Sequence, residues 1–151
     1  MKTLLPFVLA ALFTSPLSAE NGEVPASEQL FFSMDEVDLK QFKWKKRPVV
    51  VFADSDLDPA FVEQMKLLRE RPDELMARDV VVITDTNPEP LSDLRRKLRP
   101  RNFMLVLINK EGTVNVRKPF PLDVREVSRS IDKMPIRQRE IREEKARAAE
   151  G

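Results

Sequence analysis

Two carboxylates, Asp54 and Asp56, follow a short apolar run with one residue between them. Carboxylate oxygens are ligands that Mg²⁺ prefers, and a metal ion held in this way can stabilise a phosphoryl group during its transfer. Asp85 and Lys110 each follow another apolar run and could complete such a site. One hypothesis is therefore a magnesium-dependent phosphoryl hydrolase that uses the Asp54/Asp56 pair.

The same acidic segment has two further interpretations. A calcium-binding loop is excluded, because its sixth position is Pro59 where a sharp turn needs glycine, and its twelfth is Met65 where a bidentate glutamate is needed. A structural role is favoured instead, since Asp58 followed by Pro59 is typical of the start of a helix. Carboxylates there accept hydrogen bonds from free amides and complement the helix dipole.

Cysteine, histidine and tyrosine are absent from the 151 residues. Without cysteine the chain cannot form disulfides, exchange thiols or hold a thiolate-bound metal. Without histidine it lacks the commonest general base and the commonest metal ligand. We therefore predict no cofactor and no thiol-disulfide oxidoreductase or peroxidase activity, and outside the hydrolase hypothesis we expect no metal and no catalytic residues.

Two basic segments are further candidates for binding. The segment 95–101 carries five cationic residues just before the third apolar run, and we expect a solvated helix face there. The segment 43–47 surrounds Trp44, the only tryptophan, with lysine and arginine. An exposed tryptophan among cations could stack on a ligand, but we favour a core position for its ring, with the neighbouring cations in solvent.

Residues 1–19 have the features of a signal peptide in the usual order: Lys2, an apolar run of about ten residues, Pro16, and small residues up to Ala19. We therefore expect an exported protein, periplasmic or extracellular, with no membrane span once this segment is removed. Its removal takes one of the 26 basic residues and none of the 25 acidic ones, which leaves a formal net charge of zero. This balance argues against nucleic acid as a partner.

After a flexible polar lead at 20–30, the hydrophobic pattern predicts a βαβαββα order. Continuous apolar runs indicate strands buried on both faces, and alternation indicates a strand with one wetter face. The predicted strands are 49–53, 80–84, 103–108 and 113–117, and the predicted helices begin at 59, 91 and 124. We expect an α/β sandwich with a mixed four-stranded sheet, its first three strands parallel and its last antiparallel, and helices on both faces.

This order of elements is that of the thioredoxin-like core, and the turn at 109–112 resembles the corresponding hairpin of thioredoxins and peroxiredoxins. The segments 42–44, 47–52, 103–112 and 132–137 resemble a bacterial family of domains of unknown function. That family is cysteine-poor and peroxiredoxin-like, and its relatives occur in extracellular sushi-repeat and matrix proteins. The resemblance implies a thioredoxin-like domain at 31–135, followed by a charged helical tail at 136–151.

The resemblance also implies where a site would lie. The redox motif of thioredoxins would fall at 56–59, where no sulfur is present. A thioredoxin-like frame presents the start of its first core helix to peptides or small ligands, which implies a binding surface made of Asp56, Leu57, Arg101 and Phe103. We therefore expect a non-catalytic binding or scaffolding module of the periplasm, with a protein or peptide partner in the cell envelope. The oligomeric state stays open.

Overall fold

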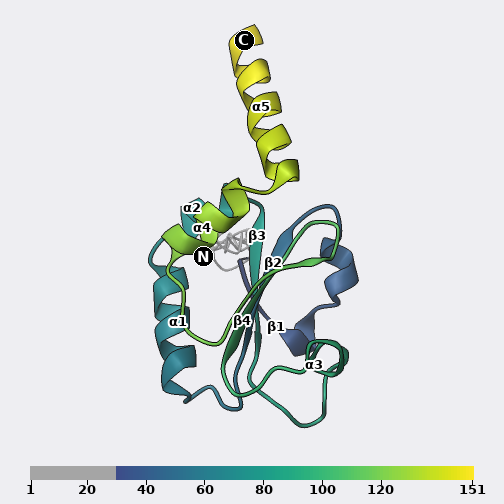
Figure 1. The fold of residues 1–151 in the computed structure, drawn as a ribbon, viewed down its shortest axis with the longest axis vertical. Coiled ribbons are helices and arrows are strands. Elements are labelled where there is room, and N and C mark those ends of the chain that lie inside the picture. Colours follow the sequence, from purple (N-terminus) through teal and green to yellow (C-terminus); the bar gives the residue numbers. More distant parts are fainter. Residues whose placement is uncertain (1–29) are drawn as a thin grey trace, which may run out of the picture.

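The computed structural model describes residues 30–151, which form an α/β sandwich with a five-stranded mixed sheet and helices on both faces (Figure 1). The fold class expected from the sequence is confirmed, with one strand more than the four expected. The expected signal peptide at 1–19 and the lead at 20–29 lie outside the described residues. Leu30 is 2% exposed and belongs to the core.

The sheet has the strand order β1-β3-β2-β4-β5. Its strands are β1 (Phe31–Ser33), β2 (Arg47–Phe52), β3 (Val80–Asp85), β4 (Met104–Ile108) and β5 (Val114–Lys118). β3 pairs in parallel with both β1 and β2, whereas β4 is antiparallel to β2, and β5 is antiparallel to β4. Every residue of β2 is buried, as a continuous run of valines bounded by turn residues predicts.

The direction of β4 and the number of strands differ from our expectation. We expected 103–108 to be a third parallel strand, but Phe52 pairs with Met104 and Val49 with Leu107, so β4 is antiparallel to β2. The helix between β3 and β4 has six residues, about 9 Å of helix, which is shorter than the roughly 20 Å of β3, so it does not carry the chain back along the sheet. The additional strand, β1, has three residues, too few to show a hydrophobic period.

Local sequence signals set the helix boundaries. The helices are α1 (Pro59–Arg69), α2 (Pro72–Met76), α3 (Asp93–Leu98), α4 (Val124–Asp132) and α5 (Pro135–Glu150), with 3-10 turns η2 (Met34–Glu36) and η3 (Leu39–Phe42). As expected, Asp58 caps α1: its Oδ1 accepts hydrogen bonds from the amides of Ala60 (2.8 Å) and Phe61 (3.2 Å). Asp123 and Glu126 form a reciprocal capping box at the start of α4.

The sheet separates two hydrophobic cores of unequal cover. The first lies beneath α1, α2 and α4 and contains fully buried residues such as Leu68 and Ile131. The second lies beneath η3 and α3 and includes Phe42, Leu98 and Ile108. Because η3 and α3 have only four and six residues, the second face is covered less completely than the first.

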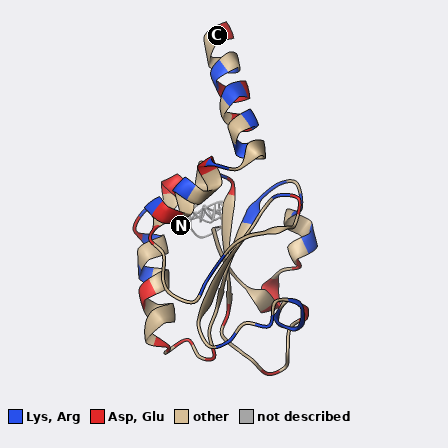
Figure 2. Ribbon diagram, in the orientation of Figure 1, with Lys and Arg blue, Asp and Glu red and all other residues tan. Residues whose placement is uncertain are grey.

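Helix α5 projects away from the sandwich (Figure 1). Basic and acidic residues alternate along it (Figure 2), and the residues after Ile141 are exposed. Its first turn differs from the solvated tail that we expected, because Arg137 is 8% exposed and contacts the body of the domain. None of the helices within residues 30–151 is long and apolar enough to cross a membrane.

Candidate functional site

The acidic segment 54–58 forms the loop between β2 and α1, and its side chains have structural partners. Asp58 caps α1, and the Ser55 hydroxyl accepts a hydrogen bond from the Leu57 amide at 3.1 Å. Asp54 and Asp56 are exposed, and the Leu57 side chain projects into solvent with 80% of its surface accessible. The favoured structural interpretation therefore holds for Asp58, while Asp56 and Leu57 remain accessible to a partner.

Asp85, at the end of β3, forms a buried ion pair with Arg95 of α3. Arg95 Nε lies 2.8 Å from Asp85 Oδ1, and the two side chains are 4% and 3% exposed. Arg95 Nη2 also donates to the Ala53 carbonyl at 2.6 Å, while Asp54 lies 4.0 Å from Nη1. Our expectation that Arg95 belongs to a solvated helix face is wrong, because α3 turns it inward between the ends of β2 and β3.

The four residues of the hydrolase hypothesis do not converge. Asp54 and Asp85 lie near Arg95 at one end of the sheet. Lys110 follows β4 at the opposite end, because β4 is antiparallel, and its Nζ lies 2.8 Å from Asp79 Oδ2. No group of three or more acidic residues within 30–151 is arranged to hold a metal ion. The geometry therefore gives no support to a magnesium and lysine cradle.

The surface implied by the thioredoxin-like frame is present only in part. Arg101 is exposed in the loop before β4, at the sheet end where the loop after β2 also emerges, because Phe52 pairs with Met104. Phe103, in contrast, is 5% exposed and packs in the first core. The expectation that Phe103 supplies apolar contact to a partner is therefore wrong, and Leu57 is the apolar residue that this end presents.

Trp44 lies outside the core. Its side chain is 64% exposed, so the favoured core position is wrong and the alternative, an exposed ring among cations, describes the structure. The residue has a positive φ of 66°, and its amide donates a 2.7 Å hydrogen bond to the Lys110 carbonyl. This contact holds the connection between η3 and β2 against the turn between β4 and β5.

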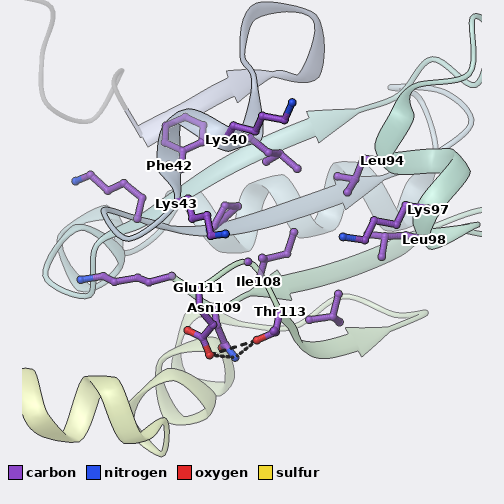
Figure 3. A pocket seen from close by; sticks show the side chains of 16 residues that line it. Lys40, Phe42, Lys43, Leu94, Lys97, Leu98, Ile108, Asn109, Glu111 and Thr113 are labelled. Atoms are coloured by element: carbon purple, nitrogen blue, oxygen red, sulfur yellow. Dashed lines mark hydrogen bonds between the residues drawn. The ribbon is translucent and has the colours of Figure 1, made fainter.

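A cavity of about 370 Å³ lies on the thinly covered second face, between η3, α3 and the turn after β4 (Figure 3). We call it the lysine pocket. Five lysines line it: Lys40, Lys43, Lys46, Lys97 and Lys110. Its apolar lining comes mainly from Leu39, Phe42, Leu94, Leu98, Ile108 and Val114. In Figure 3, Lys97 extends from α3 toward the opposite wall.

The lysine pocket carries a positive charge that the described chain leaves unneutralised. Four of its lysines, Lys40, Lys43, Lys46 and Lys97, form no ion pair within residues 30–151. Lys110 also lines the pocket, but it is paired with Asp79 and Glu140. The carboxylate on the lining belongs to Glu111, whose Oε1 accepts hydrogen bonds at 3.3 Å from Asn109 and Thr113 within the turn (Figure 3).

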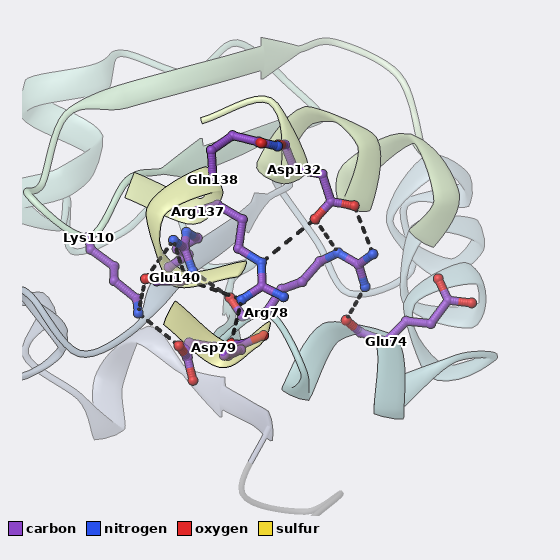
Figure 4. Close-up of polar contacts among 10 residues, drawn as sticks. Glu74, Arg78, Asp79, Lys110, Asp132, Arg137, Gln138 and Glu140 are labelled. Atoms are coloured by element: carbon purple, nitrogen blue, oxygen red, sulfur yellow. Dashed lines mark hydrogen bonds and ion pairs between the residues drawn. The ribbon is translucent and has the colours of Figure 1, made fainter. Parts of the chain in front are cut away.

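A second polar cluster, which we call the α5 clamp, fixes the base of α5 to the sheet (Figure 4). At its centre Glu140 lies 3.1 Å from Arg47 Nη2, 2.6 Å from Lys110 Nζ and 3.3 Å from Arg137 Nη1. Arg47 is a strand residue that is 1% exposed, and its Nη1 donates to the Arg78 carbonyl at 2.8 Å. The clamp joins the start of β2, the end of β4 and the last helix.

Two pKa values follow from the geometry of the α5 clamp. Burial disfavours the charged form of Glu140, but the hydrogen bond from Lys110 and the attraction of Arg47 outweigh it and lower the pKa of Glu140. Burial likewise opposes the charge on Arg137, but hydrogen bonds to Glu140 and Glu144 raise the pKa of Arg137. Both groups are therefore held in their charged forms, which suits a structural clamp better than proton transfer.

Sequence reasoning found part of the lysine pocket. The basic segment 43–47 was recognised as a candidate, and the spacing of Lys40, Lys43 and Lys46 by three residues is a signal that lysines recur on one side of a short helical turn. Lys97 lies far away in the sequence, so no local pattern joins it to the others. The α5 clamp was missed because Arg47 and Glu140 are brought together only by the fold.

These features define a thioredoxin-like α/β domain whose sequence contains no cysteine. The chain belongs to a family of domains of unknown function, DUF4174, which matches residues 38–140. None of the curated proteins matches the sequence.

Among solved structures the chain is similar to the reduced 2-Cys peroxiredoxin of Plasmodium vivax, with 17% identity, a TM-score of 0.54, and 64% of this chain and 81% of that chain covered. It is also similar to the mitochondrial 2-Cys peroxiredoxin of Plasmodium falciparum, with 18% identity, a TM-score of 0.47, and 64% and 79% covered. At 17% identity, the similarity to the Plasmodium vivax structure shows the fold alone, and it supports the thioredoxin-like and peroxiredoxin-like architecture.

Proposed function

We propose that this protein is an exported, non-catalytic binding module of the cell envelope, periplasmic in a Gram-negative host, and that it binds an anionic ligand in the lysine pocket. The observation that carries the proposal is the set of lysines without ion pairs over an apolar floor. A small concave site with apolar walls and a few convergent polar groups is the usual form of a ligand site.

A binding role fits the residues better than catalysis does. The sequence has no thiol and no imidazole, so thiol exchange and histidine-based proton transfer are beyond its chemistry. Two of the carboxylates that could replace them are occupied, since Asp58 caps a helix and Asp85 neutralises Arg95, and Asp54 does not converge with Lys110. The lysine ammonium groups, in contrast, are available to attract an anion by charge.

The proposal extends to origin and export. The resemblance of segments such as 47–52 and 103–112 supports a bacterial family related to domains of extracellular sushi-repeat and matrix proteins. The order of features in residues 1–19 supports export. Sequencing the amino terminus of the protein recovered from its host tests export, since cleavage near Ala19 is expected and an intact Met1 in the cytoplasmic fraction would contradict it.

Binding at the lysine pocket can be tested with the anionic dye 8-anilinonaphthalene-1-sulfonate. We expect the mature protein to bind the dye, and the double variant Lys40→Gln/Lys97→Gln to bind it roughly fivefold more weakly, because two partly exposed ion pairs are lost. The matched control is Lys66→Gln/Lys145→Gln, which removes the same charge from exposed positions on α1 and α5. Equal dye affinity in the two double variants would refute the pocket as the binding site.

A second surface is a candidate for a protein or peptide partner, because Leu57 is 80% exposed beside Asp56. Arg101 emerges at the same end of the sheet and could orient a polar partner. The scaffolding role would then use this end, with the lysine pocket on the second face. This idea can be tested by placing a cross-linking group at Leu57 or, as a control, at Val62, an exposed apolar residue on α1. We expect a partner to be captured from position 57 and not from position 62. A partner captured equally well from both positions would argue against a specific surface.

A further inference from the structure

We infer that the ligand of the lysine pocket is a small anionic amphiphile: one negatively charged head group, such as a carboxylate, on an unbranched aliphatic chain. This inference rests on the proposed binding function and adds the chemical class of the ligand. It follows from three properties of the pocket: its size, the kind of cation on its walls, and the kind of apolar residue on its floor.

The size of the lysine pocket fits a small molecule. Its volume of about 370 Å³ lies near the lower end of the usual range for ligand sites, roughly 300–1,000 Å³. The pocket lies beside η3 and α3, both too short to close over the second face of the sheet. A folded protein surface would therefore contact only its rim, whereas a narrow chain can reach its floor.

The cations of the lysine pocket select for negative charge and impose little geometry on the head group. All of the pocket's cationic residues are lysines, and no arginine lines it. Arginine offers a planar fork that suits bidentate recognition of carboxylate and phosphate alike, whereas lysine is a compact charge on a flexible stem that accepts any small anionic group. Lys40 and Lys43 stand on the η3 side and Lys97 stands on the α3 side, so a head group entering between them meets cations from both walls.

The floor of the lysine pocket is aliphatic. Leu39, Leu94, Ile108 and Val114 line it, and Phe42 is its one aromatic residue. Aromatic ligands gain from stacking on aromatic side chains, which this floor barely offers. An aliphatic chain needs only the removal of apolar surface from water, and the branched side chains here provide that without any directional contact.

The experiment compares single-chain amphiphiles below their micelle concentrations by calorimetry with the mature protein. We expect decanoate to bind, while decanol and decyltrimethylammonium, which share its chain but lack the negative charge, bind at least tenfold more weakly. Along the series hexanoate, octanoate and decanoate, affinity should rise by up to roughly fourfold for each methylene buried. The variant Lys40→Gln/Lys97→Gln should lose decanoate affinity, and Lys66→Gln/Lys145→Gln should retain it.

The outcomes separate this inference from the proposed function. Pocket-dependent dye binding without decanoate binding would overturn the aliphatic ligand and leave the anion site intact. Failure of both ligands would overturn both. Vesicles of phosphatidylglycerol form a further arm: if the protein binds vesicles through Lys40 and Lys97 but binds no free decanoate, the lysine pocket is a membrane contact and the inference is wrong. Equal affinity for decanoate and decanol would also refute it, because charge would then play no part.

Discussion

Replacing Glu140 by glutamine should destabilise the domain far more than the same change elsewhere on α5. Glu140 pairs with three cations, and one of them, Arg47, is 1% exposed. Without the carboxylate, Arg47 keeps its charge in a buried position, and its guanidinium retains one hydrogen bond, to the backbone carbonyl of Arg78. A buried charge that loses its partner cannot recover its hydration, so the folded state bears the cost.

The magnitude follows from the burial of the two partners in the α5 clamp. Removing one member of a buried pair costs about 3–5 kcal/mol. The Glu140 side chain is 20% exposed, and glutamine keeps one acceptor oxygen, so we expect a loss of about 2 kcal/mol in the free energy of unfolding. With a urea dependence of about 2 kcal/mol per molar, the unfolding midpoint should fall by about 1 M.

Urea unfolding followed by far-ultraviolet circular dichroism measures this effect. The control is Glu143→Gln on the exposed part of α5, which should change the free energy of unfolding by less than about 0.5 kcal/mol. If Glu140→Gln and Glu143→Gln unfold at the same urea concentration, the α5 clamp does not stabilise the domain and the reasoning fails. The same change can be made in an Arg47→Met background, which has no buried charge at this position. If Glu140→Gln then lowers the free energy of unfolding much less, the buried charge of Arg47 is the cause of the loss.

Three further predictions concern pH, a second buried pair and the start of the domain. Because the pKa of Glu140 lies below its ordinary 4.5 in the folded state, the stabilisation by Glu140 is complete above that value and is lost as the pH falls through the folded-state pKa. The urea midpoints of the parent and Glu140→Gln should therefore converge as the pH is lowered below 4.5. Asp85→Asn should cost about 3 kcal/mol in urea unfolding, since it leaves Arg95 charged and buried, whereas Asp56→Asn should cost almost nothing; equal losses would contradict this. Leu30→Ala should cost about 2–3 kcal/mol, because its side chain is 2% exposed, and an unchanged thermal midpoint would show that the core does not need it.

The sequence predicted the strands well because their signal is local. β2, β3 and β4 are continuous apolar runs bounded by proline, aspartate or asparagine, and burial on both faces is the condition that such runs satisfy. The direction of β4 could not be found in this way, since an apolar run reads the same in either direction. A parallel β4 would need a crossover along the sheet, and α3 is short for one. The pattern at 91–98 predicted a longer helix than the six residues of α3.

The site was harder to predict because charges show no period that separates buried from solvated ones. Arg95 and Arg96 are neighbours of the same type, yet the side chain of Arg95 is 4% exposed and that of Arg96 is 63% exposed. Their difference arises from Asp85, which the fold brings beneath α3. For the same reason, Phe103 was expected at the surface although it packs in the core, and Trp44 was expected in the core although it lies at the surface.

The exposed position of Trp44 has a consequence for how this protein absorbs and emits light. Trp44 is the single indole, and no tyrosine contributes, so the long-wavelength band of the near-ultraviolet absorbance and the indole fluorescence both arise from one side chain that is 64% exposed. An indole already in water in the native state emits much as it does in the unfolded chain. The tryptophan emission should therefore change little on unfolding, and the folded domain would have the fluorescence emission spectrum of a denatured one.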